Sequence, residues 1–172
     1  MRFLCVVFAL LSLTACSKYG TPAPSAPDYS GNWSSLQPHS AAQVGTGVLL
    51  TISGQTVTSA TVVTEDYFGS APQPGCLLVF TASGSSTFAG NSFVVPLSLA
   101  SNAIAGISTL PLATASTFTG AVTLQGTFSS PTTATGQLIY TISSATCAGM
   151  TYTGISPTPG FGNQIRTFTA SK

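Results

Sequence analysis

Few side chains of this 172-residue chain could act as an acid, a base or a nucleophile. The sole histidine, His39, lies between a proline and a serine, a context that predicts a solvated loop. Glu65 and Asp66 are adjacent, and because neighbouring residues of a strand point to opposite faces, they make a poor acid–base pair. The chain has neither a G-x-S-x-G nucleophile turn nor a phosphate-binding glycine loop. We therefore expect no catalytic residue, no metal site and no cofactor, and we expect that the protein is not an enzyme.

Cysteine is the remaining reactive side chain, and one cysteine stands at the end of a short apolar leader. Arg2 precedes an apolar run over residues 3–13, which is too short to span a bilayer and is typical of a secretory signal peptide. The run leads into Leu13-Thr14-Ala15-Cys16, which resembles the lipobox of bacterial lipoproteins. That resemblance implies cleavage before Cys16 and attachment of acyl chains such as palmitate to this residue. The alternative is an ordinary signal peptide with a chance cysteine beside its cleavage site.

The residues after the lipobox indicate where the protein resides. Ser17 follows the cysteine, and the resemblance to lipoproteins that lack Asp at this position implies transfer to the outer membrane if the organism is Gram-negative. We accordingly expect a cell-envelope protein whose partner is the membrane, held through the lipid anchor. Residues 17–30 contain three prolines and no apolar periodicity, which predicts a semi-extended tether. The expected domains are a signal peptide at 1–15, the lipidated cysteine with a disordered Pro-rich tether at 16–30, and a single β domain at 31–172.

The other cysteines divide by position. Cys5 lies within the signal peptide, and once Cys16 is lipidated, Cys76 and Cys147 remain as an even pair in an exported chain. We predict a disulfide between them, which stabilises the fold by roughly 4 kcal/mol if loop entropy is its source. The alternative is a redox or metal-binding thiol pair, although neither a CxxC spacing nor a histidine cluster accompanies these cysteines.

The composition excludes one class of partner and favours one class of fold. Charged residues form 4% of the chain, and once Arg2 leaves with the signal peptide, acidic and basic residues are equal in number. No basic stripe is available for binding nucleic acid. The chain contains 24 serines and 26 threonines. A composition rich in threonine and valine and poor in lysine and glutamate favours β-strands over helices.

Short alternating segments separated by turn residues predict eight to ten strands and an all-β fold. The expected strands are residues 32–36, 47–52, 57–63, 76–82, 87–89, 93–99, 117–128, 136–142, 150–155 and 164–170. Gly54 predicts a tight hairpin turn, and Pro96 predicts an edge strand or a bulge. Residues 100–116 are irregular and predict a long loop or a short strand. A small antiparallel β-barrel is the first choice because closure removes sheet edges, and a β-sandwich is the second.

Two residues near the ends of the expected domain resemble a feature of the lipocalins. Gly31-Asn32-Trp33 is similar to their G-x-W motif, in which the tryptophan plugs the closed end of an eight-stranded barrel and an arginine of the last strand packs across it. The last expected strand contains Arg166, so the resemblance implies that Trp33 and Arg166 close a lipocalin-like barrel. Such a cation–π contact contributes about 0.5 to 2 kcal/mol. The alternative is that Trp33 is a core aromatic and Arg166 a surface charge.

Two functions remain after these exclusions. The first is a non-enzymatic structural or protein-interaction role, in which the barrel interior is a solid core and the outer hydroxyl-rich face contacts an envelope protein. The alternative is a lipocalin-like carrier whose interior holds a small apolar ligand. The first ranks higher because the inward side chains are large enough to fill a small barrel. Those expected inward residues are Phe93, Val95, Leu97, Val122, Leu124, Leu138 and Tyr140.

Overall fold

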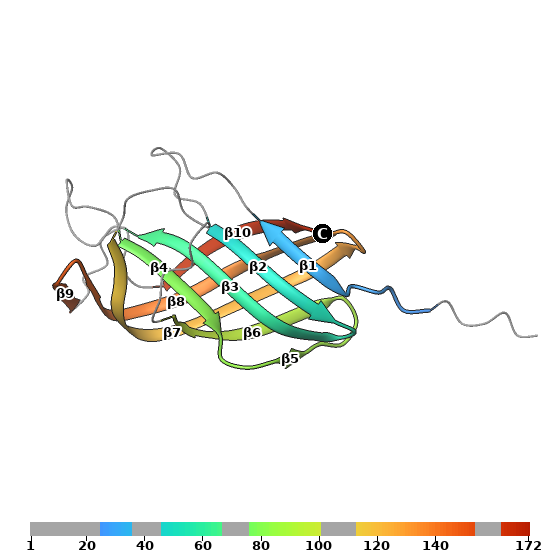
Figure 1. Ribbon diagram of the computed structural model, residues 1–172, viewed down its shortest axis with the longest axis horizontal. Coiled ribbons are helices and arrows are strands. Elements are labelled where there is room, and N and C mark those ends of the chain that lie inside the picture. Colours follow the sequence, from blue (N-terminus) through green and yellow to red (C-terminus); the bar gives the residue numbers. More distant parts are fainter. Residues whose placement is uncertain (1–24, 36–45, 67–75, 101–112, 154–162) are drawn as a thin grey trace, which may run out of the picture.

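The computed structural model describes residues 25–35, 46–66, 76–100, 113–153 and 163–172. All regular elements in these ranges are β-strands, and they belong to one sheet (Figure 1), so the prediction of an all-β fold is confirmed. The strands are β1 Gly31–Ser35, β2 Thr46–Ser53, β3 Thr56–Asp66, β4 Cys76–Ala82, β5 Ser86–Thr87, β6 Ser92–Leu99, β7 Ala113–Ser130, β8 Thr133–Cys147, β9 Met150–Thr153 and β10 Asn163–Ser171.

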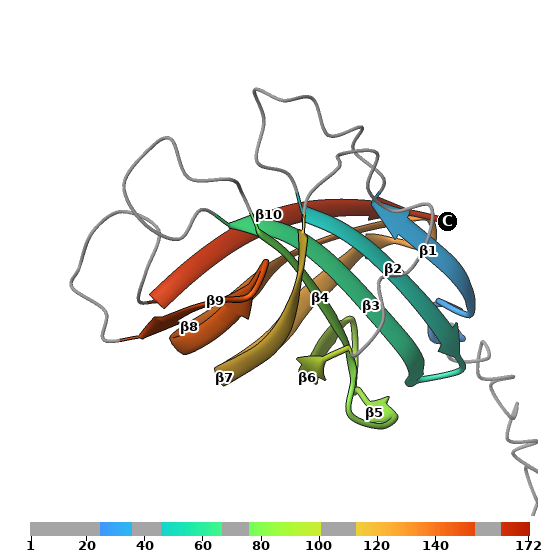
Figure 2. The same ribbon diagram turned by 60° about the vertical axis from the view of Figure 1, so that its left-hand side comes forward.

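Eight of these strands form a closed ring. The path of hydrogen-bonded neighbours runs β1–β2–β3–β4–β6–β7–β8–β10, and β10 also pairs with β1 through Ser171 and Ser34. All pairings along this path are antiparallel, and an additional short parallel pairing, in which Cys76 of β4 lies opposite Ala113 of β7, stands outside it. β5 pairs with β3, and β9 pairs with β8. Figure 2 shows the ring strands curving around a common interior.

Local turn chemistry accounts for two of the connections. Between β2 and β3, Gly54 has a φ of +58°, a left-handed conformation that glycine adopts without strain. Between β7 and β8, the chain turns at Pro131 and Thr132, where proline supplies the fixed φ that a turn requires. Both hairpins that the sequence predicts are therefore present.

β7 and β8 are longer than the sequence pattern predicts. Their register runs from Ala115 opposite Cys147 to Ser130 opposite Thr133, with a bulge between Thr119 and Gly120. The added ends consist mostly of serine, threonine and alanine, and the inward alanines are too small to give a strong alternating pattern. Residues 113–116 of the segment expected to be irregular belong to β7, and residues 101–112 lie outside the described residues.

The expectation that Pro96 marks an edge strand does not hold, because β6 lies between β4 and β7. Pro96 is opposite Thr123 of β7, and its carbonyl oxygen accepts a hydrogen bond from the Ser83 amide at 3.2 Å. The β4 ladder ends at Ala82, opposite Leu97. Pro96 has no N–H to donate to Ser83 in return, so the β4–β6 pairing ends here and proline costs only the last bond of that ladder.

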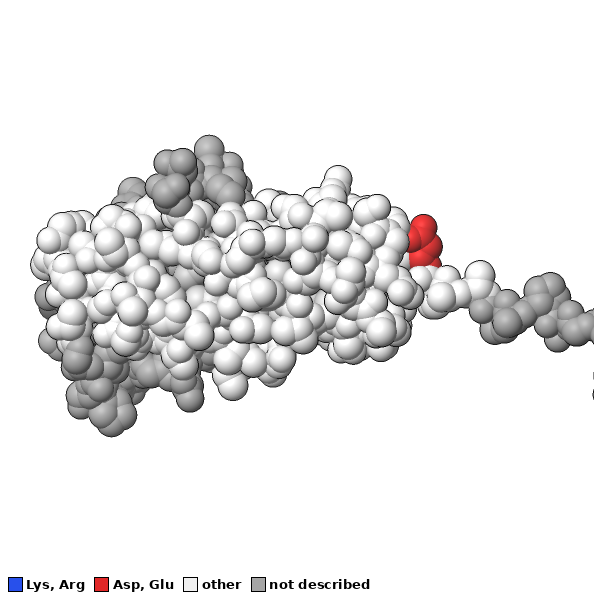
Figure 3. All heavy atoms as spheres, turned by 90° about the horizontal axis from the view of Figure 1, so that it is seen from below, with Lys and Arg blue, Asp and Glu red and all other residues white. Residues whose placement is uncertain are grey.

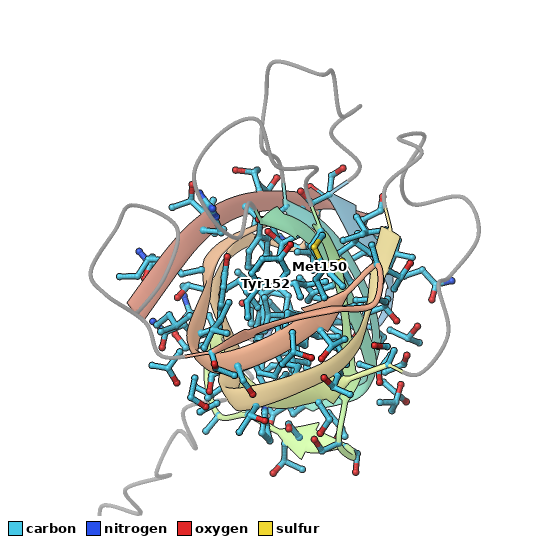
Figure 4. The ribbon with its side chains drawn as sticks, turned by 90° about the vertical axis from the view of Figure 1, so that its left-hand side faces the viewer. Met150 and Tyr152 are labelled. Atoms are coloured by element: carbon cyan, nitrogen blue, oxygen red, sulfur yellow. A yellow bond between two sulfur atoms is a disulfide. The ribbon has the colours of Figure 1, made fainter. Side chains whose placement is uncertain are left out.

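Apolar side chains pack the interior of the ring. All seven residues expected to point inward, from Phe93 on β6 to Tyr140 on β8, are buried. Aromatic rings meet across this space, since the Phe80 ring centroid lies 5.1 Å from that of Phe118 and 6.3 Å from that of Tyr140. Figure 4, a view along the ring, shows side chains between the strands and places Met150 and Tyr152 at the near end.

The two ends of the ring differ in what they contain. Residues 25–30 enter the sheet at one end, here named the tether end, where the β2–β3 turn also lies (Figure 1). The Lys172 amide donates to the carbonyl oxygen of Thr132 at 3.3 Å, so the last described residue lies at the β7–β8 turn of the same end. The opposite end, here named the distal end, contains Cys76, Cys147 and β9.

Candidate functional site

Some of the residues that the sequence analysis considered for chemistry lie within the described structure, and others do not. Cys16 and His39 lie outside the described residues. Glu65 and Asp66 are consecutive at the end of β3, and their backbones pair with the start of β4. Among the described residues, no three His, Cys, Asp or Glu side chains are grouped as a metal site requires. The part of the chain with described coordinates also contains no helix long and apolar enough to cross a membrane.

Cys76 and Cys147 form a disulfide, as the sequence predicts. Their Cα atoms are 6.0 Å apart, within the usual range for this bond. Cys76 begins β4 and Cys147 ends β8, and these strands are not neighbours in the sheet. Both cysteines are buried. The disulfide therefore fastens the distal end of the ring across strands that backbone hydrogen bonds do not join.

Trp33 is buried at the tether end with 1% of its surface exposed. Its indole N–H donates a hydrogen bond to the carbonyl oxygen of Tyr29 at 2.9 Å. Phe128 is the centre of the surrounding aromatic cluster, with its ring centroid 5.0 Å from that of Trp33 and 4.2 Å from that of Tyr29. Phe88 and Phe93 complete the cluster, at 5.4 Å and 5.2 Å from Phe128. Trp33 is thus part of a buried cluster of five aromatic side chains at the tether end.

Arg166 lies farther along the ring, half-buried on β10 and opposite Leu138 of β8. It is five residues from Ser171, whose pairing with Ser34 joins β10 to β1. Five residues of strand span about 17 Å. A contact between Arg166 and Trp33 stays a prediction, and a double-mutant cycle with Trp33→Phe and Arg166→Ala measures the coupling between them.

A row of four residues crosses β6, β7, β8 and β10 on the inner face. Phe93 is opposite Gly126, Gly126 is opposite Gly136, and Gly136 is opposite Phe168. A Cβ atom on Gly126 would lie 2.5 Å from the Phe93 ring, and one on Gly136 would lie 2.7 Å from the Phe168 ring. We name this the Phe–Gly–Gly–Phe row. The phenyl rings fill the space above the glycines, an arrangement that permits sharp curvature of the sheet.

On the outer side of this row, the surface forms an open groove of about 560 Å³, here named the outer groove. Two cross-strand rows of outward side chains border it. The first row is Val94, Gln125, Gln137 and Thr167, and the second is Ser92, Thr127, Thr135 and Thr169. None of the described residues that line this groove is charged. Figure 3 likewise shows a long face of the molecule with no Lys or Arg side chain and with acidic atoms only at the tether end.

Hydroxyl side chains pair across strands elsewhere on the outer surface. The Thr146 hydroxyl lies 2.7 Å from that of Thr117 on β7 and 2.8 Å from that of Thr151 on β9. Such cross-strand pairs stabilise a sheet modestly and satisfy each other's hydrogen-bonding groups. The expected hydroxyl-rich exterior is therefore present on these strands, where threonine hydroxyls of neighbouring strands form hydrogen bonds with one another.

One carboxylate at the tether end has a shifted pKa. The hydroxyl and the backbone amide of Ser30 both donate to Asp28, the amide at 2.9 Å, and these hydrogen bonds lower the pKa of that carboxyl below its ordinary value. The positive charge of Lys172 acts in the same direction and more weakly. The Ser30 hydroxyl oxygen also accepts from the Gly54 amide at 2.9 Å. Ser30 therefore links the segment before β1 to the β2–β3 turn.

Comparisons of the chain with protein families, with curated proteins and with solved structures found no match. The class of protein that the described residues define is an all-β domain, built as a ring of mostly antiparallel strands and crosslinked by one disulfide at its distal end.

Proposed function

We propose that this chain is a lipid-anchored lipoprotein of the cell envelope, whose ring of strands is a small filled β-barrel with a non-enzymatic structural or binding role. The packed interior is the observation that carries this proposal. Phe80, Phe128 and Tyr140 are buried and contact other aromatic rings. Eight strands enclose a space that their own side chains can fill. The interior therefore acts as a core, and recognition of partners falls to the outer surface.

The position of the tether supports an anchored role for the barrel. Residues 25–30 leave the ring at the tether end, whereas the disulfide lies at the distal end. Residues 17–28 precede the packed Tyr29, and an extended Pro-rich chain of this length reaches about 37 Å. A lipid on Cys16 would thus hold the domain clear of the headgroups, with the distal end directed away from the bilayer and the outer groove accessible from the side.

Replacing Cys16 with serine in the full chain tests the anchor. Serine cannot carry a thioether-linked lipid, so we expect the C16S variant to lose metabolic labelling by an alkyne analogue of palmitate and to leave the membrane fraction. Cys5→Ser, within the expected signal peptide, is the matched control and should keep both properties. Labelling of C16S at the level of the unchanged chain would contradict the proposal.

A further inference from the structure

We infer that the outer groove binds an uncharged carbohydrate chain, with Gln125 and Gln137 as its central hydrogen-bonding residues. The inference deepens the proposed function, because it rests on the outer surface being the working face of the barrel. It is independent of the lipid anchor, since every residue that carries it lies in β6, β7, β8 or β10.

The two glutamines lie opposite each other at the centre of the groove, on β7 and β8. Val94 of β6 is opposite Gln125, and Thr167 of β10 is opposite Gln137. Neighbouring strands are about 4.8 Å apart, so this row presents its side chains over about 14 Å. A linear ligand that crosses the strands would therefore meet an amide, a second amide and a hydroxyl in succession.

The polar groups of this row are not engaged with the rest of the described chain. The side chains of Gln125, Gln137 and Thr167 form no hydrogen bond with a described residue, in contrast to the paired hydroxyls of Thr117 and Thr146. Each glutamine amide has two donors and one acceptor oxygen, and a threonine hydroxyl has both capacities. The groove thus offers a row of uncharged donors and acceptors.

This array decides the chemistry of the ligand. A phosphate or carboxylate ligand would lose hydration without a cation in the groove to compensate it. A purely apolar ligand would cover the amides and leave them without hydrogen bonds. A neutral polyhydroxylated chain exchanges its bonds to water for bonds to these groups, while its C–H faces pack on Val94, which is 57% exposed. The volume of about 560 Å³ is also within the range of about 300 to 1,000 Å³ for ligand sites.

The shape of the groove is set by buried residues, so the site exists before a ligand arrives. Phe93 and Phe168 are buried and occupy the space above Gly126 and Gly136, which keeps the sheet curved at this place. A preformed site loses little conformational entropy on binding. The same four strands that pack the core therefore fix the backbone positions from which the two glutamines extend.

Titration of the full-length protein in detergent with chitohexaose, cellohexaose and maltohexaose tests the inference, with calorimetry or NMR as the readout. We expect saturable binding of at least one sugar, weakened about tenfold or more in the Gln125→Ala, Gln137→Ala double variant because two hydrogen-bonding side chains are lost. Gln55→Ala, the same substitution at the β2–β3 turn, is the matched control and should leave affinity unchanged. Thr167→Val removes one hydroxyl at nearly constant volume and provides a second test if the double variant does not fold.

Several outcomes would overturn the inference. These are no binding of any of the three sugars, equal weakening in Gln55→Ala, or stronger binding of acidic polygalacturonate than of the neutral sugars. Groove-dependent capture of an envelope protein or of a second copy, without sugar binding, would replace it with a protein interface. None of these results depends on Cys16, so palmitate labelling distinguishes failure of the proposed anchor from failure of the sugar site.

Discussion

At the scale of single residues, a few side chains join the segment before β1 to the sheet. Tyr29 precedes the first strand, yet it belongs to the hydrophobic core, where it stacks on Phe128 at 4.2 Å. Its carbonyl oxygen accepts from the Trp33 indole, and its neighbour Ser30 bonds both Asp28 and the Gly54 amide. These contacts fix the direction in which the chain leaves the domain.

The shifted carboxyl of Asp28 gives a prediction at this scale. We expect its pKa, measured by pH titration of the carboxyl carbon in NMR spectra, to lie below that of an aspartate in an unfolded peptide. Because the pKa is lower in the folded protein, the contact with Ser30 stabilises the fold fully at a pH above the pKa of the unfolded chain. This stabilisation is lost as the pH falls through the pKa of the folded protein. Ser30→Ala should raise the pKa, since it removes the largest cause, and Lys172→Ala should raise it less. An unchanged pKa in Ser30→Ala would contradict this assignment.

The sequence alone predicted the structural role of some residues and not of others. The Cys76–Cys147 disulfide was predicted from the count of cysteines together with the expectation that the chain is exported, and the structure confirms the disulfide. The burial of Trp33 also agrees with the sequence. The central position of Phe128 was not predicted, because alternation assigns a residue to a face of the sheet without showing which distant residues it meets there.

At the scale of elements, the Phe–Gly–Gly–Phe row shows how four strands share one curved region. Its glycines do not terminate a strand, although glycine in isolation weakens one. They instead receive rings from β6 and β10 on the inner side, and the outer groove lies on the opposite side of the same row. The row could not be predicted from the sequence, because it depends on the register of four strands that span residues 93 to 168.

Replacing Gly136 with alanine tests the row. The added methyl group would lie 2.7 Å from the Phe168 ring and would overlap the carbonyl oxygen of Gln125. We expect a loss of about 1 to 3 kcal/mol in the free energy of unfolding, measured by denaturant titration. Gly84→Ala is the control, because its Cβ would meet nothing within 4 Å, and a change within about 0.5 kcal/mol is expected. Equal stability of the two variants would show that the row is not tightly packed.

Alternation predicted the strands well where one face is apolar and the other polar. β6 follows this rule throughout, with Phe93, Val95 and Leu97 buried between exposed neighbours. It failed at the ends of β7 and β8, where the buried positions are small residues such as Ala115, Ala134 and Ala145, which contrast little with the serines and threonines between them. It also misplaced Pro96, because the position of a strand within the sheet depends on its partners and not on its own composition.

At the scale of the whole molecule, two features hold the ring together at opposite ends. The aromatic cluster around Phe128 packs the tether end, and the Cys76–Cys147 disulfide crosslinks the distal end. The outer groove lies on the side wall over β6, β7, β8 and β10, at the level of Phe93 of the aromatic cluster. The hydroxyl-rich exterior was predictable from composition, but the place of the groove was not, because it requires the curvature of the assembled sheet.

The disulfide gives a prediction for the stability of the whole domain. The Cys76→Ala, Cys147→Ala variant should lose about 4 kcal/mol in the free energy of unfolding, because the crosslink closes a span of 71 residues. Thermal unfolding with and without reductant measures this loss. Reductant should lower the midpoint of the unchanged protein toward that of the variant and should not affect the variant itself. Equal midpoints for the two proteins without reductant would contradict the stabilising role.

The pairing of β1 with β10 has a consequence for how the protein is made. The first strand to emerge and the last one are neighbours, and their junction rests on Ser34 and Ser171. Hairpins such as β2–β3 form quickly from local contacts, but closure joins residues at maximal sequence separation and is slow. One edge of β1 therefore stays open until β10 has paired with it. During that interval, the unpaired edge can join another chain.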